Sequence, residues 1–155
     1  MRLLLDTMYL LPAIGVAIEG LPIDAPVKVM ERGHEISISD VTLFELAAKG
    51  SKYVTGGELE AERVSKGMKA IVYDEKILKI PTYYTSVLHT AFTLRRTLND
   101  LIDCLILSSA VKKCDVLVTE EDRIHDLEGR TFFQEIIITI KPEFKVHKIS
   151  DLLQR

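Results

Sequence analysis

Short apolar runs alternate with longer amphipathic stretches along most of this chain. The runs RLLLD at residues 2–6 and DVLVT at 115–119 are continuous, which is typical of strands buried on both faces of a sheet. EISIS at 35–39 alternates between polar and apolar residues and predicts a second strand. The same criteria predict further strands over 76–80, 135–141 and 145–149.

Helical spacing and helix stop signals separate these strands. Leu43, Leu46 and Ala47 fall on one helical face, and Gly50 is a natural stop after them. Buried strands that alternate with helices favour a mostly parallel sheet with helices on both faces, a three-layer α/β/α sandwich. We predict helices over residues 10–20, 25–33, 41–50, 56–73, 83–98 and 100–114, and a short helix or turn over 120–127.

Length and composition limit the number of domains, the kind of partner and the cellular location that we expect. A chain of 155 residues with 47% hydrophobic residues is long enough for one domain with a real core, which we expect to span 1–155. The net charge of −3 gives no general attraction to a polyanion, so nucleic-acid binding would depend on a local basic patch. No apolar stretch approaches the roughly 20 residues of a membrane helix, and the two cysteines form no CxxC pair, so we expect a cytoplasmic protein.

Acidic residues stand at the ends of two predicted strands and near the starts of two predicted helices. In open α/β sheets, binding sites lie outside the carboxyl ends of the strands, so we expect these carboxylates to converge on one edge. The acids are Asp6 after the first strand, Glu45 in helix 41–50, Asp100 and Asp103 at the start of helix 100–114, and Glu120, Glu121 and Asp122 after strand 115–119.

Each acid also has an ordinary structural interpretation, as a helix cap or as a charge that favours a helix N-terminus. Asp103 weakens that interpretation, because the apolar residues on both sides of it leave little solvent-facing surface for an unpaired carboxylate. Mg²⁺ or Mn²⁺ is the simplest neutralising partner for clustered carboxylates. The sequence lacks the ligand spacing of a zinc site, the GxSxG motif of a hydrolase triad and a Walker lysine motif.

Four motifs in this chain resemble, in order, those of the PIN-domain ribonucleases, a family that includes many VapC-type toxins of prokaryotes. The similarity extends over nearly the whole chain, and it implies the PIN-like α/β/α fold and metal-dependent hydrolysis of RNA phosphodiester bonds with Mg²⁺ or Mn²⁺. The motifs are LLLDT at 3–7, TLFEL at 42–46, DCLILSSA at 103–110 and VTEED at 118–122.

The resemblance also implies which residues form the site. The family's acid after the last motif's threonine matches Glu121, with Asp122 as the alternative one residue later, and Thr119 is the supporting hydroxyl. Met8 departs from the family, which often has Asn, Ser or His at this position. The implied catalytic and metal-binding acids are Asp6, Glu45, Asp103 and Glu121 or Asp122, with Asp100 as an additional ligand or an outer acid.

Partners follow from the same resemblance: single-stranded or structured RNA, an antitoxin protein, and a second copy of the chain in a homodimer. The apolar excess of residues 8–20 and 83–98 also favours a homodimer. The alternative function is an inactive PIN-like module that binds RNA or protein. A phosphatase of the haloacid dehalogenase type would need an Asp where Met8 stands. Candidate RNA contacts are Lys49, Lys52, Arg95, Arg96 and Arg123, although these cations also suit helix ends and solvated surfaces.

Overall fold

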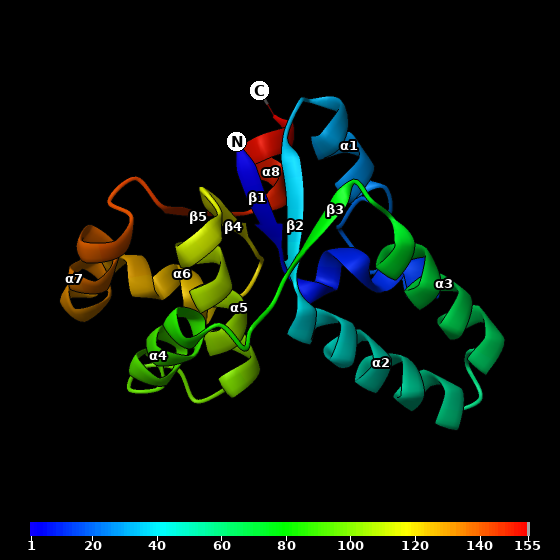
Figure 1. The fold of residues 1–155 in the computed structure, drawn as a ribbon. Helices are drawn as coiled ribbons and strands as arrows, with labels where there is room; N and C mark the ends of the chain where they lie inside the picture. Colours follow the sequence, from blue (N-terminus) through cyan, green and yellow to red (C-terminus); the bar gives the residue numbers. More distant parts are fainter. Residues whose placement is uncertain (155) are drawn as a thin grey trace.

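A five-stranded sheet in the order β3-β2-β1-β4-β5 forms the centre of the computed structural model, which describes residues 1–154 (Figure 1). All neighbouring strands pair in parallel; Leu4 of β1, for example, is in register with Ser37 of β2 and Leu117 of β4. The α/β fold with a parallel sheet is therefore confirmed. The strands are β1 (Arg2–Leu5), β2 (Glu35–Ser39), β3 (Ile77–Ile80), β4 (Val116–Val118) and β5 (Lys145–His147).

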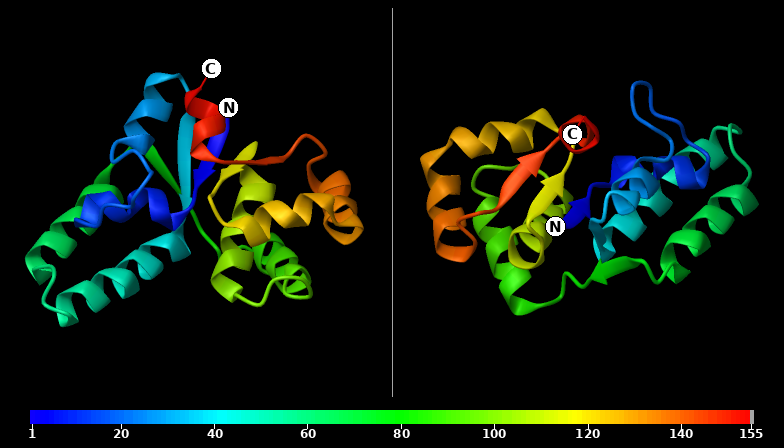
Figure 2. Two further views of the ribbon diagram at one scale, coloured as in Figure 1. Left: turned by 180° about the vertical axis from the view of Figure 1, so that it is seen from behind. Right: turned by 90° about the horizontal axis from the view of Figure 1, so that it is seen from above.

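Helices cover both faces of this sheet (Figures 1 and 2). Successive residues of a strand point to opposite faces, so Leu3 and Leu5 pack in one half of the core and Leu4 in the other. The first half contains apolar side chains of η1 (Thr7–Ile14, a 3₁₀-helix), α1 (Ala25–Glu31), α2 (Asp40–Thr55), α3 (Ala61–Tyr73) and α8 (Ile149–Leu153). The second half contains those of α4 (Thr85–Leu94), α5 (Leu101–Lys113), α6 (Asp122–His125), η2 (Asp126–Gly129) and α7 (Thr131–Ile140).

The strand predicted over 135–141 is wrong, because these residues lie mostly in helix α7. Its run of isoleucines has the composition of a strand, but the burial follows helical spacing: Phe133 and Ile137 are buried, while Ile138 is 64% exposed. Packing of this helical face into the core half that contains α5 overrides the local preference.

Two predicted helices have different bounds for steric reasons. The helix expected over 10–20 is a 3₁₀-helix that contains Pro12 and ends at Gly15, whose φ of 102° is left-handed. The helix expected to stop at Gly50 continues to Thr55. Gly50 serves close packing instead, because a Cβ atom there would lie 2.6 Å from a methyl group of Val64 in α3.

Gly67 lies where α3 packs closely on η1, and this contact can be tested by mutation. A Cβ atom at this position would lie 2.1 Å from the backbone oxygen of Ala13, which cannot move as a flexible side chain can. We expect Gly67→Ala to lower the free energy of unfolding by about 1–3 kcal/mol or more, measured by urea denaturation. Gly129→Ala is the matched control, since no described atom lies within 4 Å of its added Cβ. Equal denaturation midpoints for the two variants would contradict this packing.

Candidate functional site

Asp6 lies where the central strand β1 ends, at the carboxyl edge of the sheet. Its backbone N–H donates to the Val118 carbonyl of β4 at 3.0 Å, which continues the parallel pairing one residue beyond the strand. Its carboxylate accepts hydrogen bonds from the Thr7 N–H at 2.7 Å and from the Thr119 hydroxyl at 2.5 Å. Burial raises the pKa of Asp6, and these two hydrogen bonds act in the opposite direction. The two expected residues Asp6 and Thr119 are thus in direct contact.

Glu45 reaches the same edge from α2. The hydroxyl of Thr7 donates to the Glu45 carboxylate, so Thr7 contacts Asp6 through its backbone and Glu45 through its side chain. Lys49, one turn further along α2, lies 3.3 Å from the other oxygen of Glu45. The negative charge of Glu45 contributes to the raised pKa of Asp6. These contacts bring the first two predicted acids together.

Asp100 and Asp103 lie at the start of α5 and differ in role. Asp100 caps the helix, accepting hydrogen bonds from the Ile102 N–H at 2.7 Å and the Asp103 N–H at 3.4 Å. The Asp103 side chain is only 22% exposed. Burial raises its pKa to about 6, and the negative charges of Asp100, Asp6 and Glu121 add to that effect. Arg123 acts in the opposite direction, but it does not cancel these effects on the pKa of Asp103.

The three successive acids after β4 contact three different groups. Glu120 accepts hydrogen bonds from the Tyr9 hydroxyl and the Ile149 N–H, which is a structural role. Glu121 lies 2.7 Å from Arg123, which in turn approaches Asp103 at 3.7 Å. Asp122 instead pairs with Lys148 at 3.2 Å, and its side chain is 85% exposed. Of the two alternatives from the sequence, Glu121 is the one that shares a partner with Asp103.

Two groups at this edge were not assigned from the sequence. Thr7 bridges Asp6 and Glu45, and its place directly after Asp6 in the LLLDT motif was the signal available for it. Arg123 was considered only as an RNA contact, whereas it forms ion pairs with Asp103 and Glu121. Its proximity to Asp103 depends on how α5 and α6 are placed, which no local motif records.

The donor set suits a hard divalent cation that keeps part of its water shell. As the side chains stand, no group of three His, Cys, Asp or Glu within residues 1–154 is arranged to hold a metal ion. Mg²⁺ commonly binds through one or two carboxylates and several waters rather than in a complete protein cage. The carboxylates of Asp6, Glu45, Asp103 and Glu121 fit that chemistry.

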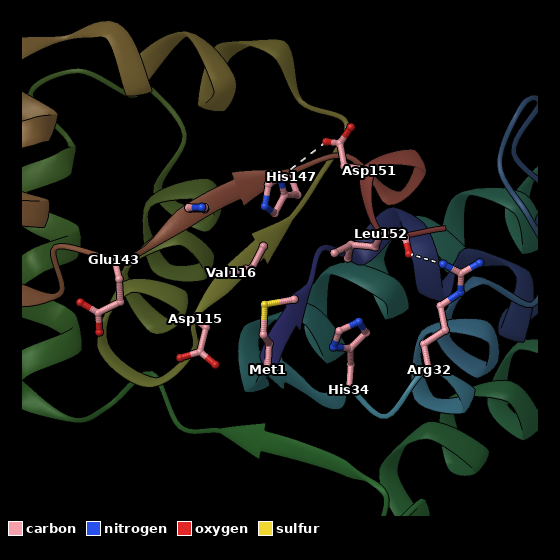
Figure 3. Close-up of a pocket in the computed structure, with 10 residues that line it drawn as sticks. Met1, Arg32, His34, Asp115, Val116, Glu143, His147, Asp151 and Leu152 are labelled. Atoms are coloured by element: carbon pink, nitrogen blue, oxygen red, sulfur yellow. Dashed lines mark hydrogen bonds and ion pairs between the residues drawn. The ribbon is translucent and has the colours of Figure 1, made fainter. Parts of the chain in front are cut away.

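The cavity beside Asp103 is too small to enclose a small-molecule substrate. A pocket of about 130 Å³ at this edge is lined by Asp103, Arg123 and Arg130, among others. That volume is below the 300–1,000 Å³ typical of small-molecule sites, but it admits a single charged group such as a phosphate. A cavity of about 740 Å³ lies at the opposite edge of the sheet, where His34 and His147 line it (Figure 3). The acids described above do not line that cavity.

The described residues include no helix that combines the length and the apolar character needed to span a membrane.

Sequence comparison finds neither a protein-family profile nor a curated protein that matches this chain. Structural comparison is more informative. One similar chain belongs to a crystal structure of VapBC2 from Rickettsia felis bound to a DNA fragment from their promoter. The two chains are 17% identical, with a TM-score of 0.59, and the match covers 96% of this chain and 98% of the other.

The fold is PIN-like. The match extends over nearly the whole of both chains, and the sheet is parallel with helices on both faces, so the fold expected from the four sequence motifs is confirmed. At 17% identity the similarity establishes the fold alone.

The raised pKa of Asp103 leads to a prediction for the metal-free PIN-like domain. The folded protein holds this proton more tightly than the unfolded chain does, because the folded pKa is about 6 against an ordinary 3.8. The stabilisation from protonated Asp103 is therefore present at low pH and is lost as the pH rises through about 6. In EDTA, Asp103→Asn should raise the melting temperature more at about pH 7 than at about pH 4.5.

Asp122→Asn serves as the control, since that carboxylate is exposed beside Lys148 and should give no such gain at neutral pH. A melting temperature of Asp103→Asn that exceeds wild type equally at both pH values, or not at all, would contradict the electrostatic account of Asp103.

Proposed function

We propose that this protein is a divalent-metal-dependent endoribonuclease of the PIN-domain type, which hydrolyses RNA phosphodiester bonds. The observation that carries the proposal is the convergence of acids from four separate elements on one edge of a PIN-like sheet. Asp6 and Glu45 share Thr7, while Asp103 and Glu121 share Arg123. Clustered carboxylates, two of which are oriented by neutral hydroxyl groups, suit the binding of divalent ions by a metal-dependent phosphodiesterase.

Each residue contributes in a definable way. Thr119 and Thr7 fix the orientation of Asp6 and Glu45 without adding positive charge, so the carboxylates remain available to a cation. Asp6, Glu45, Asp103 and Glu121 would hold Mg²⁺ or Mn²⁺, with Asp100 as an outer acid that caps α5. When bound, the ion supplies an activated water and offsets the charge of the scissile phosphate. Asp103 would reach the ion from the first turn of α5.

The choice of RNA as substrate is supported by the small volume of the pocket beside Asp103 and by nearby cations. Lys49 and Arg123 lie beside the acids, and Lys52 and Arg96 are exposed near the ends of neighbouring helices. Arg95 is a weaker candidate, because its side chain donates to the Leu98 carbonyl at 3.1 Å. Binding of a polyanion by a chain with an overall charge of −3 would depend on such local cations.

A role as the toxin of a toxin–antitoxin pair is part of the proposal. Support comes from the similar fold of a chain in VapBC2, which is a complex bound to DNA from its promoter. We infer that this chain binds an antitoxin protein and forms a homodimer. The second candidate function is a PIN-like module that binds RNA or protein without cleavage, and the incomplete metal-ligand arrangement is the observation that favours it.

Replacing Asp103 tests the nuclease directly. Asn keeps the shape of the side chain but removes a metal ligand, so Asp103→Asn should reduce Mg²⁺- or Mn²⁺-dependent cleavage of single-stranded RNA by at least about a hundredfold. Asp122→Asn, which alters an exposed carboxylate paired with Lys148, should cleave at close to the wild-type rate. Cleavage is followed on a labelled RNA with each ion and with EDTA, beside the melting temperature.

The outcomes separate the two functions. If the wild type cleaves no RNA with either ion but metal raises its melting temperature, the binding module is correct. If metal changes neither property, the acids are structural and the proposed function is wrong.

The homodimer has its own test. Tyr83 lies just before α4 and is 71% exposed, and Phe92 lies on α4 and is 61% exposed. A second copy of the chain would cover such apolar surface. We expect light scattering at micromolar concentration to give twice the mass of the 17.5 kDa chain. The mass of a single chain at that concentration would exclude a stable homodimer.

A further inference from the structure

The guanidinium of Arg123 lies between two acids of the candidate site, Asp103 and Glu121. Its Nε lies 2.7 Å from Glu121 Oε1, and its Nη2 lies 3.7 Å from Asp103 Oδ2. The two acids come from different elements, since Asp103 is on α5 and Glu121 precedes α6. The guanidinium thus bridges two of the proposed metal ligands.

We propose that Arg123 is a built-in competitor of the divalent ion: it neutralises Asp103 and Glu121 in the metal-free protein and must move away before an ion can bind them. This inference rests on the metal-dependent function proposed above. It adds that the chain itself sets a threshold for metal binding, through a side chain that is not a metal ligand.

The surroundings of Arg123 allow that movement. Its side chain is 63% exposed, and α6 spans only Asp122–His125, so the guanidinium can leave the acids for solvent without disturbing the core. Exposed ion pairs are weak, and a divalent ion carries twice the charge of the guanidinium. The metal-free arrangement is therefore stable enough to populate and weak enough to displace.

Lys49 is not an equivalent competitor. It pairs with Glu45 at 3.3 Å from one turn away on the same helix, a common pairing on helix surfaces, and within residues 1–154 it forms no ion pair with a second acid of the site. Arg123 connects two elements of the site, so its presence affects how Asp103 and Glu121 are oriented toward each other. Arg123 differs from Lys49 in that it pairs with two of the proposed ligands at once.

Metal-binding affinity, measured without any catalytic readout, tests the proposal. Isothermal titration of metal-stripped protein with Mn²⁺ and with Mg²⁺ compares the wild type with three variants. Arg123→Gln should bind about two- to fivefold more tightly, the range expected when an exposed ion pair is removed from competition. Arg123→Lys retains the charge and should stay closer to the wild type.

Arg130→Gln is the matched control. Arg130 lines the same small pocket and is exposed, but it forms no ion pair with Asp103 or Glu121 within the described chain. Its loss removes the same charge from the same surface without removing the contact, so its metal affinity should remain that of the wild type. Circular dichroism confirms that each variant is folded.

Failure of this inference can be told apart from failure of the proposed function. If the wild type binds metal and Arg123→Gln binds it equally or more weakly, Arg123 does not compete, and the metal site itself stands. If Arg130→Gln gains as much affinity as Arg123→Gln, the effect is one of general charge and the inference is overturned. If the wild type and Arg123→Gln both bind no metal, the metal-dependent function and the competition fail together.

Discussion

The parallel pairing of β1 between β2 and β4 is the constraint on which both the core and the acid cluster depend. Leu3, Leu4 and Leu5 are fully buried, and each such side chain contributes roughly 1.5–3 kcal/mol when it is transferred from water. The same pairing brings the end of β1 beside the end of β4, so that Asp6 and Thr119 meet. Carboxylates that repel one another can be kept together only because this pairing and the apolar layers around it stabilise the fold.

Neutral hydroxyl groups orient two of the acids at this edge, Asp6 and Glu45, and a neutral donor does not cancel the charge of a carboxylate. Thr7 and Thr119 satisfy oxygen atoms of Glu45 and Asp6, as lysine or arginine would, but they leave the negative charge in place. The two cations that contact the cluster within residues 1–154, Lys49 and Arg123, are substantially exposed and so are weakly held. Under the proposed function, a cation from outside the chain would displace only weakly held partners.

Local sequence patterns predicted the secondary structure correctly where the composition of a segment and its burial in the fold favour the same element. The continuous apolar strands at 2–6 and 115–119 and the acids that follow them could be predicted because a parallel sheet buries both strand faces and aligns the strand ends. The segment 135–141 could not, because isoleucine suits a strand locally while Phe133 and Ile137 pack as one helical face.

The sequence also could not show which of two neighbouring acids, Glu121 or Asp122, belongs to the site. Glu121 and Asp122 are neighbours with the same charge, and their partners, Arg123 and Lys148, become distinguishable only when α6 is positioned against β5 and α8. The ion pair of Arg123 with Asp103 joins residues 20 positions apart, and it depends on the packing of α5 and α6 rather than on any motif.

The most direct measurement of the central claim is the position of a bound ion. Crystals grown with Mn²⁺ should show an anomalous scattering peak at the carboxyl edge of the sheet, within about 2–2.5 Å of carboxylate oxygens of Asp6 and Asp103. In that structure the Arg123 side chain should have moved away from Asp103. A peak confined to the opposite edge near His34 and His147, or no peak at the carboxyl edge, would contradict the claim that these acids form a metal site.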